Sequence, residues 1–195
     1  MLGSSTLDIL KKIVLNNKDV ESVDLREYVY PGMPPGTLPA IGDVIHHIGV
    51  DKLGKIDFII SHLQKNRNIG IESKVVINRN IRHIPMMDFS IKKSEKNLKK
   101  ISTVWKKLMV PKFGRGVFVE TDNSYHFIGT ERLLDENELG EWLAYCLLSI
   151  SGNAGRYKTY VDVQYVAYCI LKNSMCLRVS EYPNSHFKPQ VCLEI

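Results

Sequence analysis

Apolar residues recur along this chain with two different spacings, and the spacing predicts helices in some segments and strands in others. Four apolar residues between positions 98 and 108 are separated by three, four and three positions, and lysines surround them. This is the period of a single apolar face on a helix whose other faces are basic. The four residues are Leu98, Ile101, Trp105 and Leu108. Similar spacing predicts a flanking amphipathic helix over the first fifteen residues, and a helix after Asp135 and Glu138, which resemble a capping box.

Two short apolar segments on either side of a polar turn predict a β-hairpin. They are residues 116–120 and 125–129, joined by the turn TDNS. Further strands are expected at 84–89, 159–163 and 176–180, with a helix at 166–171. From residue 81 onward the predicted order is therefore β-α-β-β-α followed by strand. This is the split β-α-β arrangement of ferredoxin-like and RNA-recognition-type sheets.

The chain before residue 81 has a different character. Residues 30–43 contain four of the eight prolines, which predicts a long loop. Residues 44–80 alternate short apolar and polar runs, which indicates small strands or a strand and a helix. We expect residues 1–80 to form the N-terminal helix, the loop and a small α/β unit, and residues 81–195 an RNA-recognition-like unit, packed together as one domain. The predicted fold class is α/β (α+β).

The composition of this 195-residue chain is that of a globular protein, with 44% hydrophobic and 24% charged residues. It excludes disordered, collagen-like and coiled-coil proteins. The longest unbroken apolar run, residues 142–148, is far shorter than the roughly 20 residues of a membrane span. The N-terminal segment also lacks the pattern of a secretory signal. We therefore expect a cytoplasmic protein with no membrane partner.

Positive charge is concentrated in one segment of the chain. The formal net charge is +5 at pH 7, and seven lysines but only one acid, Glu95, lie between residues 92 and 107. A concentrated basic stripe attracts phosphate groups, so this segment is a candidate for nucleic-acid contact; the alternative is a solvated helix face. The candidate contacts are Lys92, Lys93, Lys96, Lys99 and Lys100.

The cysteines and the paired histidines do not predict a metal site. The four cysteines contain no Cys-x-x-Cys pair, and free thiols in a cytosolic chain behave as small hydrophobic residues. His46 and His47 are adjacent, so on a strand they lie on opposite sides and do not share one ion.

Polar side chains on the predicted strands point to one cleft. Alternate residues of a strand share a face, so Asp88 lies with Ser90, and Ser124 lies with His126. Asp162 is an isolated acid in a predicted strand, and Arg178 in the last strand is a natural partner for it. Structural alternatives exist for these residues: Asp88 caps a turn or helix, His126 is a structural histidine and Ser124 belongs to the turn. Arg178 pairs with Asp162 or Glu181.

These residues occur in four short motifs in a fixed order: MMDFS, SYHFI, YVDVQ and LRVS, over about residues 84–180. The ordered set resembles the archaeo-eukaryotic primase superfamily, the catalytic domain of primases and primase-polymerases. The first motif of that family has acids two positions apart on a strand. The second has a small residue, any residue and histidine, and the third ends a strand with another acid.

The resemblance implies a primase-like core in which a small N-terminal α/β unit packs with an RNA-recognition-like sheet. It implies that Asp88 and Asp162 are catalytic residues that ligate Mg²⁺ or Mn²⁺. It also implies that Ser124, His126 and Arg178 bind a nucleoside triphosphate during priming or extension of a nucleic-acid strand. A separate helicase or accessory protein subunit is the further partner expected, because the chain is too short to include such a domain.

One position departs from the family pattern. Residue 90 is serine where the first motif has a second acid, so only two acids remain in the set. Two carboxylates are enough to hold one metal ion but too few to hold two metal ions well. The main hypothesis is a metal-dependent nucleotidyltransferase. The alternative is a degenerate, inactive relative that binds nucleic acid or a protein partner. A plain RNA-recognition-like module is a third hypothesis, and it requires exposed aromatic residues on the sheet face. Phe118 and Phe127 lie on the predicted strands, but the pattern does not determine which side they occupy.

Overall fold

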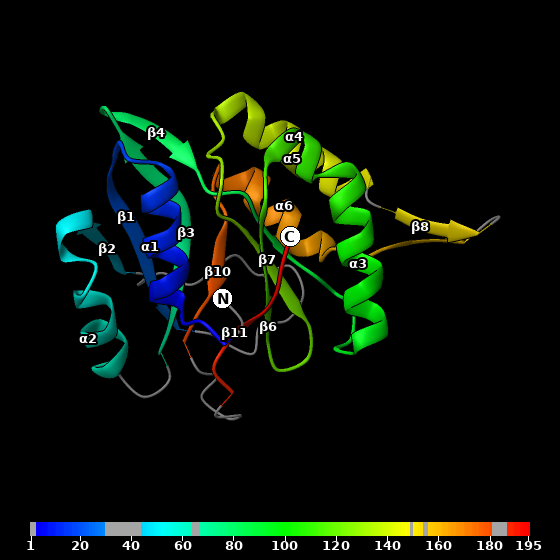
Figure 1. Cartoon of the computed structure of the whole chain (residues 1–195), viewed down its shortest axis with the longest axis horizontal. Coiled ribbons are helices and arrows are strands. Elements are labelled where there is room, and N and C mark those ends of the chain that lie inside the picture. The colour runs from blue at the N-terminus through cyan, green and yellow to red at the C-terminus, as the bar shows by residue number, and fades with distance from the viewer. Residues whose placement is uncertain (1–2, 30–43, 64–66, 149, 154–155, 181–186) are drawn as a thin grey trace.

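Two large antiparallel sheets lie next to each other, and helices pack against both; β8 and β9 form a separate two-stranded sheet (Figure 1). This computed structural model describes residues 3–29, 44–63, 67–148, 150–153, 156–180 and 187–195. The loop predicted at residues 30–43 lies outside the described residues. The expected α/β (α+β) class is confirmed.

The first sheet has five strands, in the order β10-β3-β1-β2, with β4 also paired to β3. The strands are β1 (Val20–Val29), β2 (Val44–Gly49), β3 (Arg67–Ile77), β4 (Asn80–His83) and β10 (Cys176–Arg178). Helix α1 (Thr6–Asn16) lies across one face of this sheet (Figure 1). Its residues Leu10 and Ile13 are completely buried, so the predicted N-terminal helix is confirmed but belongs to the core rather than to a flank.

The second sheet has the strand order β11-β6-β7-β5. Its strands are β5 (Met86–Asp88), β6 (Gly116–Glu120), β7 (Tyr125–Gly129) and β11 (Gln190–Glu194). The predicted hairpin is confirmed, because β6 and β7 pair from Gly116 opposite Gly129 to Glu120 opposite Tyr125.

Residues 160–162 pair with the free edge of β5. Phe89 and Val161 form an antiparallel bridge, and the Ser90 nitrogen donates to the Tyr160 oxygen at 2.9 Å. The order across the sheet is thus 160–162, β5, β7 and β6, which is the strand order of a split β-α-β fold. The predicted RNA-recognition-like sheet is confirmed, with its fourth strand reduced to three residues and β11 added at the opposite edge.

An aromatic cluster packs helices α3 (Glu95–Leu108), α4 (Val110–Phe113) and α5 (Glu136–Leu148) against this second sheet. The Trp105 ring lies 5.9 Å from the Trp142 ring and 5.7 Å from the Phe127 ring, measured between centroids. The two tryptophan rings meet edge to face, an arrangement that adds to the free energy of burial. Leu108 departs from the predicted apolar face because it is 49% exposed, and Met109 is buried in its place.

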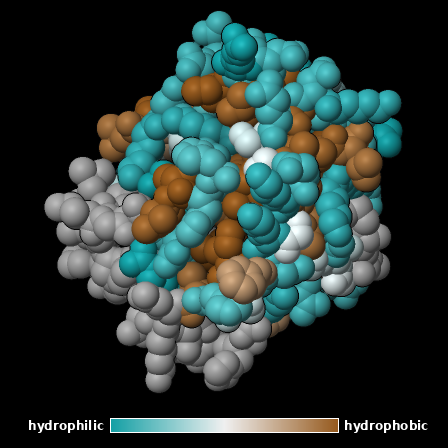
Figure 2. Space-filling model, turned by 90° about the vertical axis from the view of Figure 1, so that its left-hand side faces the viewer, coloured by the Kyte–Doolittle hydropathy of each residue, from teal (hydrophilic) through white to brown (hydrophobic). Residues whose placement is uncertain are grey.

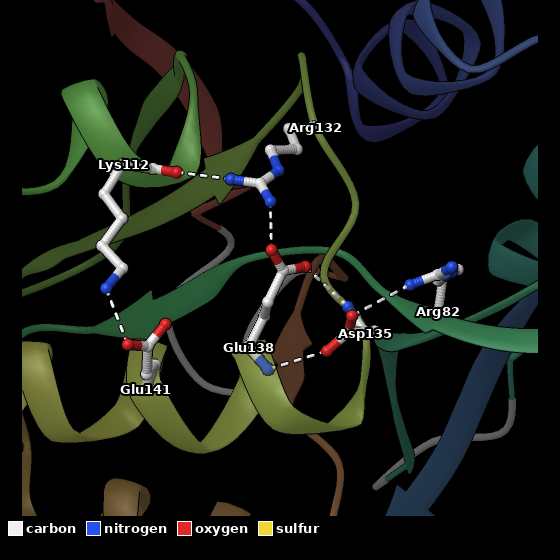
Figure 3. Close-up of polar contacts among 6 residues, drawn as sticks. All are labelled: Arg82, Lys112, Arg132, Asp135, Glu138 and Glu141. Atoms are coloured by element: carbon white, nitrogen blue, oxygen red, sulfur yellow. Dashed lines mark hydrogen bonds and ion pairs between the residues drawn. The ribbon is translucent and has the colours of Figure 1, made fainter.

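Helix α5 begins with the predicted capping box (Figure 3). The Glu138 nitrogen donates to the Asp135 carboxylate at 2.9 Å, and the Asp135 nitrogen donates to the Glu138 carboxylate at 3.0 Å. Arg82 of β4 contacts Asp135 at 3.4 Å, and Arg132 pairs with Glu138. The cap therefore also ties α5 to the first sheet.

The chain between α5 and β10 forms a hairpin and a helix. These elements are β8 (Ile150–Asn153), β9 (Arg156–Thr159) and α6 (Val163–Lys172). The predicted strand at 159–163 is wrong at its C-terminal end, because Asp162 caps α6 and Val163 is already helical. The predicted helix at 166–171 and the beginning of the strand at Cys176 are confirmed.

The side of the molecule that carries β2 and α2 (Lys55–Ser61) shows apolar surface between hydrophilic bands (Figure 2). A short 3-10 turn, η1 (Val50–Lys52), joins these two elements. Val44 and Phe58 are exposed, and the Phe58 ring stacks on His62 at 3.9 Å between centroids. Among the described residues, no helix has the length and apolar character to cross a membrane.

Candidate functional site

Asp88 and His126 lie directly opposite each other on β5 and β7. The His126 Nε2 atom is 3.5 Å from the Asp88 Oδ1 atom. The Asp88 side chain keeps 31% of its surface exposed, whereas the His126 side chain keeps 9%. The pair is therefore open to solvent on the side of Asp88.

Strand alternation determines which side of the second sheet this pair occupies. Phe89 and Phe127 follow Asp88 and His126 in the chain, and both rings belong to the aromatic cluster under α3 and α5. Successive residues of a strand point to opposite faces. Asp88 and His126 thus lie on the face away from these helices, which we call the site face.

Asp162 reaches the same place through the short fourth strand. Its main-chain nitrogen donates a hydrogen bond to the main-chain oxygen of Asp88 at 2.9 Å. Partial burial and repulsion by the Asp162 carboxylate raise the pKa of Asp88 to about 7. Two carboxylates that repel each other at a partly buried position are a centre where a cation is favoured.

Asp162 also has a structural role, that of a helix cap, which the sequence suggested for Asp88 but not for this residue. Its Oδ1 atom accepts hydrogen bonds from the nitrogens of Gln164 at 2.8 Å and Tyr165 at 3.1 Å, which caps helix α6. The cap fixes the direction of this carboxylate.

Arg178 brings the first sheet to the site. It lies on β10, opposite Gly70 of β3. Its positive charge lowers the pKa of Asp88, against the larger effects of burial and Asp162. Burial, and secondarily Arg178, lower the pKa of His126 to about 3, so this imidazole is neutral at neutral pH.

Ser124 lies at the end of the hairpin turn, next to the same strands. Its hydroxyl donates to the Phe89 oxygen, and its nitrogen donates to the Thr121 hydroxyl at 3.2 Å. Ser124 therefore ties the turn to β5 one residue beyond Asp88. Its hydroxyl proton is used in this bond, while its oxygen keeps the capacity to accept.

The comparisons with known proteins agree with this arrangement. A family model described as archaeo-eukaryotic primase 1D-like matches residues 56–190. The chain belongs to this primase-like family. Neither the curated proteins nor the solved structures contain a significant match.

Ser90 is the position at which this primase-like chain departs from the motif of acids two apart. Its main-chain nitrogen donates a hydrogen bond to the main-chain oxygen of Tyr160, and its hydroxyl donates to the main-chain oxygen of Val161 at 3.2 Å. The serine thus stabilises the pairing of β5 with the fourth strand, where a carboxylate would meet main-chain oxygens.

The acidic residues of this primase-like site fit one cation. Within the described ranges, no three His, Cys, Asp or Glu side chains are grouped as a metal site. Asp88 and Asp162 supply carboxylate oxygens, which Mg²⁺ and Mn²⁺ prefer, and Mg²⁺ commonly completes its shell with water and substrate phosphates. Glu120 is the last residue of β6 and pairs with Tyr125, so it lies on the opposite face from His126. Its carboxylate contacts Lys93 at 3.0 Å beside the start of α3. It does not add a third oxygen ligand.

The basic segment is not on the site face. Helix α3 packs through Trp105 on the opposite face of the second sheet. Lys93 pairs with Glu120, and its ammonium lies 4.5 Å from the Phe187 ring centre. The candidate residues Lys92, Lys96, Lys99 and Lys100 are exposed. Only the N-terminal start of the segment, which follows Ser90 in the chain, lies near the site.

The third hypothesis, an RNA-recognition-like module, required aromatic residues exposed on the sheet. Phe118 and Phe127 are almost completely buried, with 0% and 1% of their surface exposed. They belong to the aromatic cluster under the helices, so neither residue supplies the exposed ring that this hypothesis requires.

Tyr165 is a site neighbour that the motif pattern did not single out. Burial raises the pKa of its hydroxyl well above the usual value, and Cys169, Cys176 and Asp88 add to this shift. The hydroxyl therefore lies among α6, β10 and the site. A signal existed in the sequence, because a residue three positions after a helix cap lies on the turn that the cap begins.

Proposed function

We propose that this chain is a primase-like nucleotidyltransferase that binds a nucleoside triphosphate with one Mg²⁺ or Mn²⁺ ion and primes or extends a nucleic-acid strand. The observation that supports the proposal is the convergence of Asp88, His126 and Asp162 with Arg178. These residues come from four separate elements of both sheets. Convergence of ionisable groups with displaced pKa values is typical of functional sites.

The site residues divide into two chemical groups. Asp88 and Asp162 would hold the ion, which supplies charge neutralisation on the triphosphate during phosphoryl transfer. Arg178 would bind phosphate oxygens as a permanent cation. The neutral His126 ring would offer one hydrogen-bond donor to a phosphate without adding charge. Ser124, through its oxygen and the fixed turn, would position this end of β7.

The exposed lysines of α3 are proposed as contacts to the nucleic-acid backbone. Lys96, Lys99 and Lys100 carry positive charge on one helix with a single acid, Glu95. Helix α3 lies on the face of the second sheet opposite the site. A bound nucleic-acid strand would therefore reach these lysines only after it passes around the edge of the sheet at Lys92. A separate helicase or accessory subunit would complete a priming complex.

Synthesis of dinucleotides from labelled triphosphates in the presence of Mn²⁺ tests the enzymatic proposal. Asp88→Asn should lower the rate of dinucleotide synthesis about a hundredfold or more, because it removes one of the two carboxylates proposed to hold the metal ion. Glu120→Gln is the matched control, because Glu120 lies on the other face of the same sheet. Equal rates in the wild type and Asp88→Asn would exclude the catalytic role.

Ser90 favours a second candidate, a degenerate relative that binds nucleic acid or a protein partner without turnover. This residue is bonded to Val161 where the family motif has an acid. The second candidate predicts salt-sensitive oligonucleotide binding that needs no metal and survives Asp88→Asn. Metal-dependent triphosphate binding by the wild type would exclude it.

A further inference from the structure

Asn68 on β3 has a buried side chain whose hydrogen-bonding capacity is not used within the described part of the chain. None of its surface is exposed, and neither its Oδ1 nor its Nδ2 atom has a hydrogen-bond partner among the described residues. A carboxamide can make several hydrogen bonds, and buried polar groups in native proteins are nearly always paired. Burial without partners is unfavourable, so the Asn68 carboxamide calls for a partner that the described residues do not supply.

Strand register places Asn68 next to Arg178, one of the site residues. Gly70 lies opposite Arg178, and Glu72 lies opposite Cys176. Asn68, two residues before Gly70, shares this face and is a diagonal neighbour of Arg178 across the two strands. The intervening Ile69 and Ile71 are completely buried and lie on the other face of the strand. Strand β10, which carries Arg178, contacts β5, which carries Asp88, so this edge of the first sheet lies against the site.

Gly70 carries no side chain between Asn68 and Glu72, and the Cys176 sulfur takes up this space. A Cβ atom at this position would lie 2.5 Å from the Cys176 Sγ atom and 3.1 Å from the Leu177 oxygen. The strands β3 and β10 therefore approach closely, and no β3 side chain separates Asn68 from Arg178.

We infer that Asn68 is a specificity-determining residue that hydrogen-bonds the nucleoside part, a sugar hydroxyl or a base edge, of the bound triphosphate. The inference rests on the proposed function. Asp88, Asp162 and Arg178 are charged and suit the metal and phosphates, whereas the carboxamide is neutral and offers both a donor and an acceptor. Sites built to pair a substrate hydroxyl or base edge discriminate strongly against ligands that lack it.

Calorimetric titration with ATP, dATP and inorganic triphosphate, each with Mn²⁺, tests the inference. Asn68→Leu should weaken ATP binding roughly three- to tenfold, the range for one or two neutral hydrogen bonds, and leave inorganic triphosphate within about twofold. A loss larger for ATP than for dATP identifies the sugar 2′-hydroxyl. Equal losses for the two nucleotides identify the base edge or another hydroxyl.

Thermal unfolding separates this role from a structural one. Because Asn68→Leu removes a buried amide that gains nothing from burial, its midpoint should be unchanged or higher. Ile69→Val, the adjacent position on the other face, is the control: it should lower the midpoint without changing the ratio of ATP to inorganic triphosphate affinity. If Asn68→Leu does not fold, Asn68→Ser replaces it in the titrations.

Two results overturn the inference. If Asn68→Leu binds ATP as tightly as the wild type, or loses ATP and inorganic triphosphate equally, Asn68 does not contact the nucleoside, and the proposed function stands. If the wild type binds neither ligand, the proposed function and the inference fail together.

Discussion

The main-chain nitrogen of Asp162 donates a hydrogen bond to the main-chain oxygen of Asp88, with 2.9 Å between the two atoms. This bond belongs to the three-residue fourth strand, so the strand that completes the RNA-recognition-like sheet also brings the second acid to the first. The hairpin β6–β7 then places His126 opposite Asp88. The strand pairing that forms the sheet therefore also brings the site residues together.

Removal of lysines from α3 should reduce the salt dependence of oligonucleotide binding. Lys96→Ala, Lys99→Ala and Lys100→Ala together should lower the slope of log affinity against log salt by about 0.7 for each phosphate of a single strand that these lysines neutralise. Filter binding at several salt concentrations measures the slope. Lys52→Ala with Lys55→Ala, on η1 and α2, is the control. A slope unchanged by the α3 variant would show that these lysines form only a solvated face.

Gly70→Ala should destabilise the protein and weaken triphosphate binding. The added methyl group would meet the Cys176 Sγ atom at 2.5 Å and push β10, which carries Arg178, away from β3. We expect a loss of about 1–3 kcal/mol in the free energy of unfolding, as is usual for overpacking.

Two further variants test this steric explanation in urea unfolding. Cys176→Ala in the Gly70→Ala background removes the sulfur and should restore part of the loss. Gly140→Ala, in the exposed part of α5 with open space around it, should instead stabilise the protein by about 1 kcal/mol through helix propensity. No rescue by Cys176→Ala would contradict the explanation.

His83 should make the stability of the protein depend on pH. Burial lowers the pKa of His83 to about 4, from an ordinary value of 6.5, and Lys74 adds to the shift. Between these values the unfolded chain binds the proton and the folded chain does not, so the free energy of unfolding falls as the pH decreases from 6.5 toward 4. The contribution of His83 should be about 2 kcal/mol smaller at pH 5 than at pH 7.

Urea unfolding at the two pH values measures this effect, with His83→Gln as the comparison. The variant loses the histidine bonded to Ser73, so it is less stable at pH 7, but its stability should change less between pH 7 and pH 5. Asp88 and His126 titrate in both proteins and cancel in the comparison. The same pH dependence in both proteins would contradict the account of His83.

The capping box of α5 should contribute more to stability than the ion pairs around it. Asp135→Ala removes the acceptor for the Glu138 nitrogen and should cost about 1 kcal/mol. Glu141→Ala removes the exposed contact with Lys112 shown in Figure 3 and should cost less than about 0.5 kcal/mol. Thermal unfolding of the two variants shows which one loses more stability. Equal losses would mean that the ion pairs contribute as much to stability as the capping box.

The local elements of the second sheet were predictable because their apolar residues follow simple periods. The hairpin, the helix around Trp105 and the cap at Asp135 are of this kind. Strand β1 was missed because bulges interrupt its alternation: Val20, Val23 and Leu25 are buried, and the first two are three positions apart. A period of two does not detect such a strand.

The site was predictable to the extent that short motifs determine it. Asp88, His126, Asp162 and Arg178 converge as their motifs indicated. The role of Asp162 as a helix cap and the face occupied by Glu120 depend on where an element ends and on register. The position of Asn68 depends on pairing between β3 and β10, more than a hundred residues apart in the chain. Sequence spacing does not contain these long-range relationships.

Mn²⁺-dependent triphosphate binding by Asp88→Asn, Asp162→Asn and the double variant tests the central claim most directly. Asparagine is as good a helix cap as aspartate, so Asp162→Asn keeps α6, and Asp88→Asn removes a repelled charge from the site. If both carboxylates hold one ion, each single variant loses most of the affinity and the double variant loses little more, because their effects are not additive. Affinity that is unchanged in the single variants, or losses that simply add, would contradict a shared metal site.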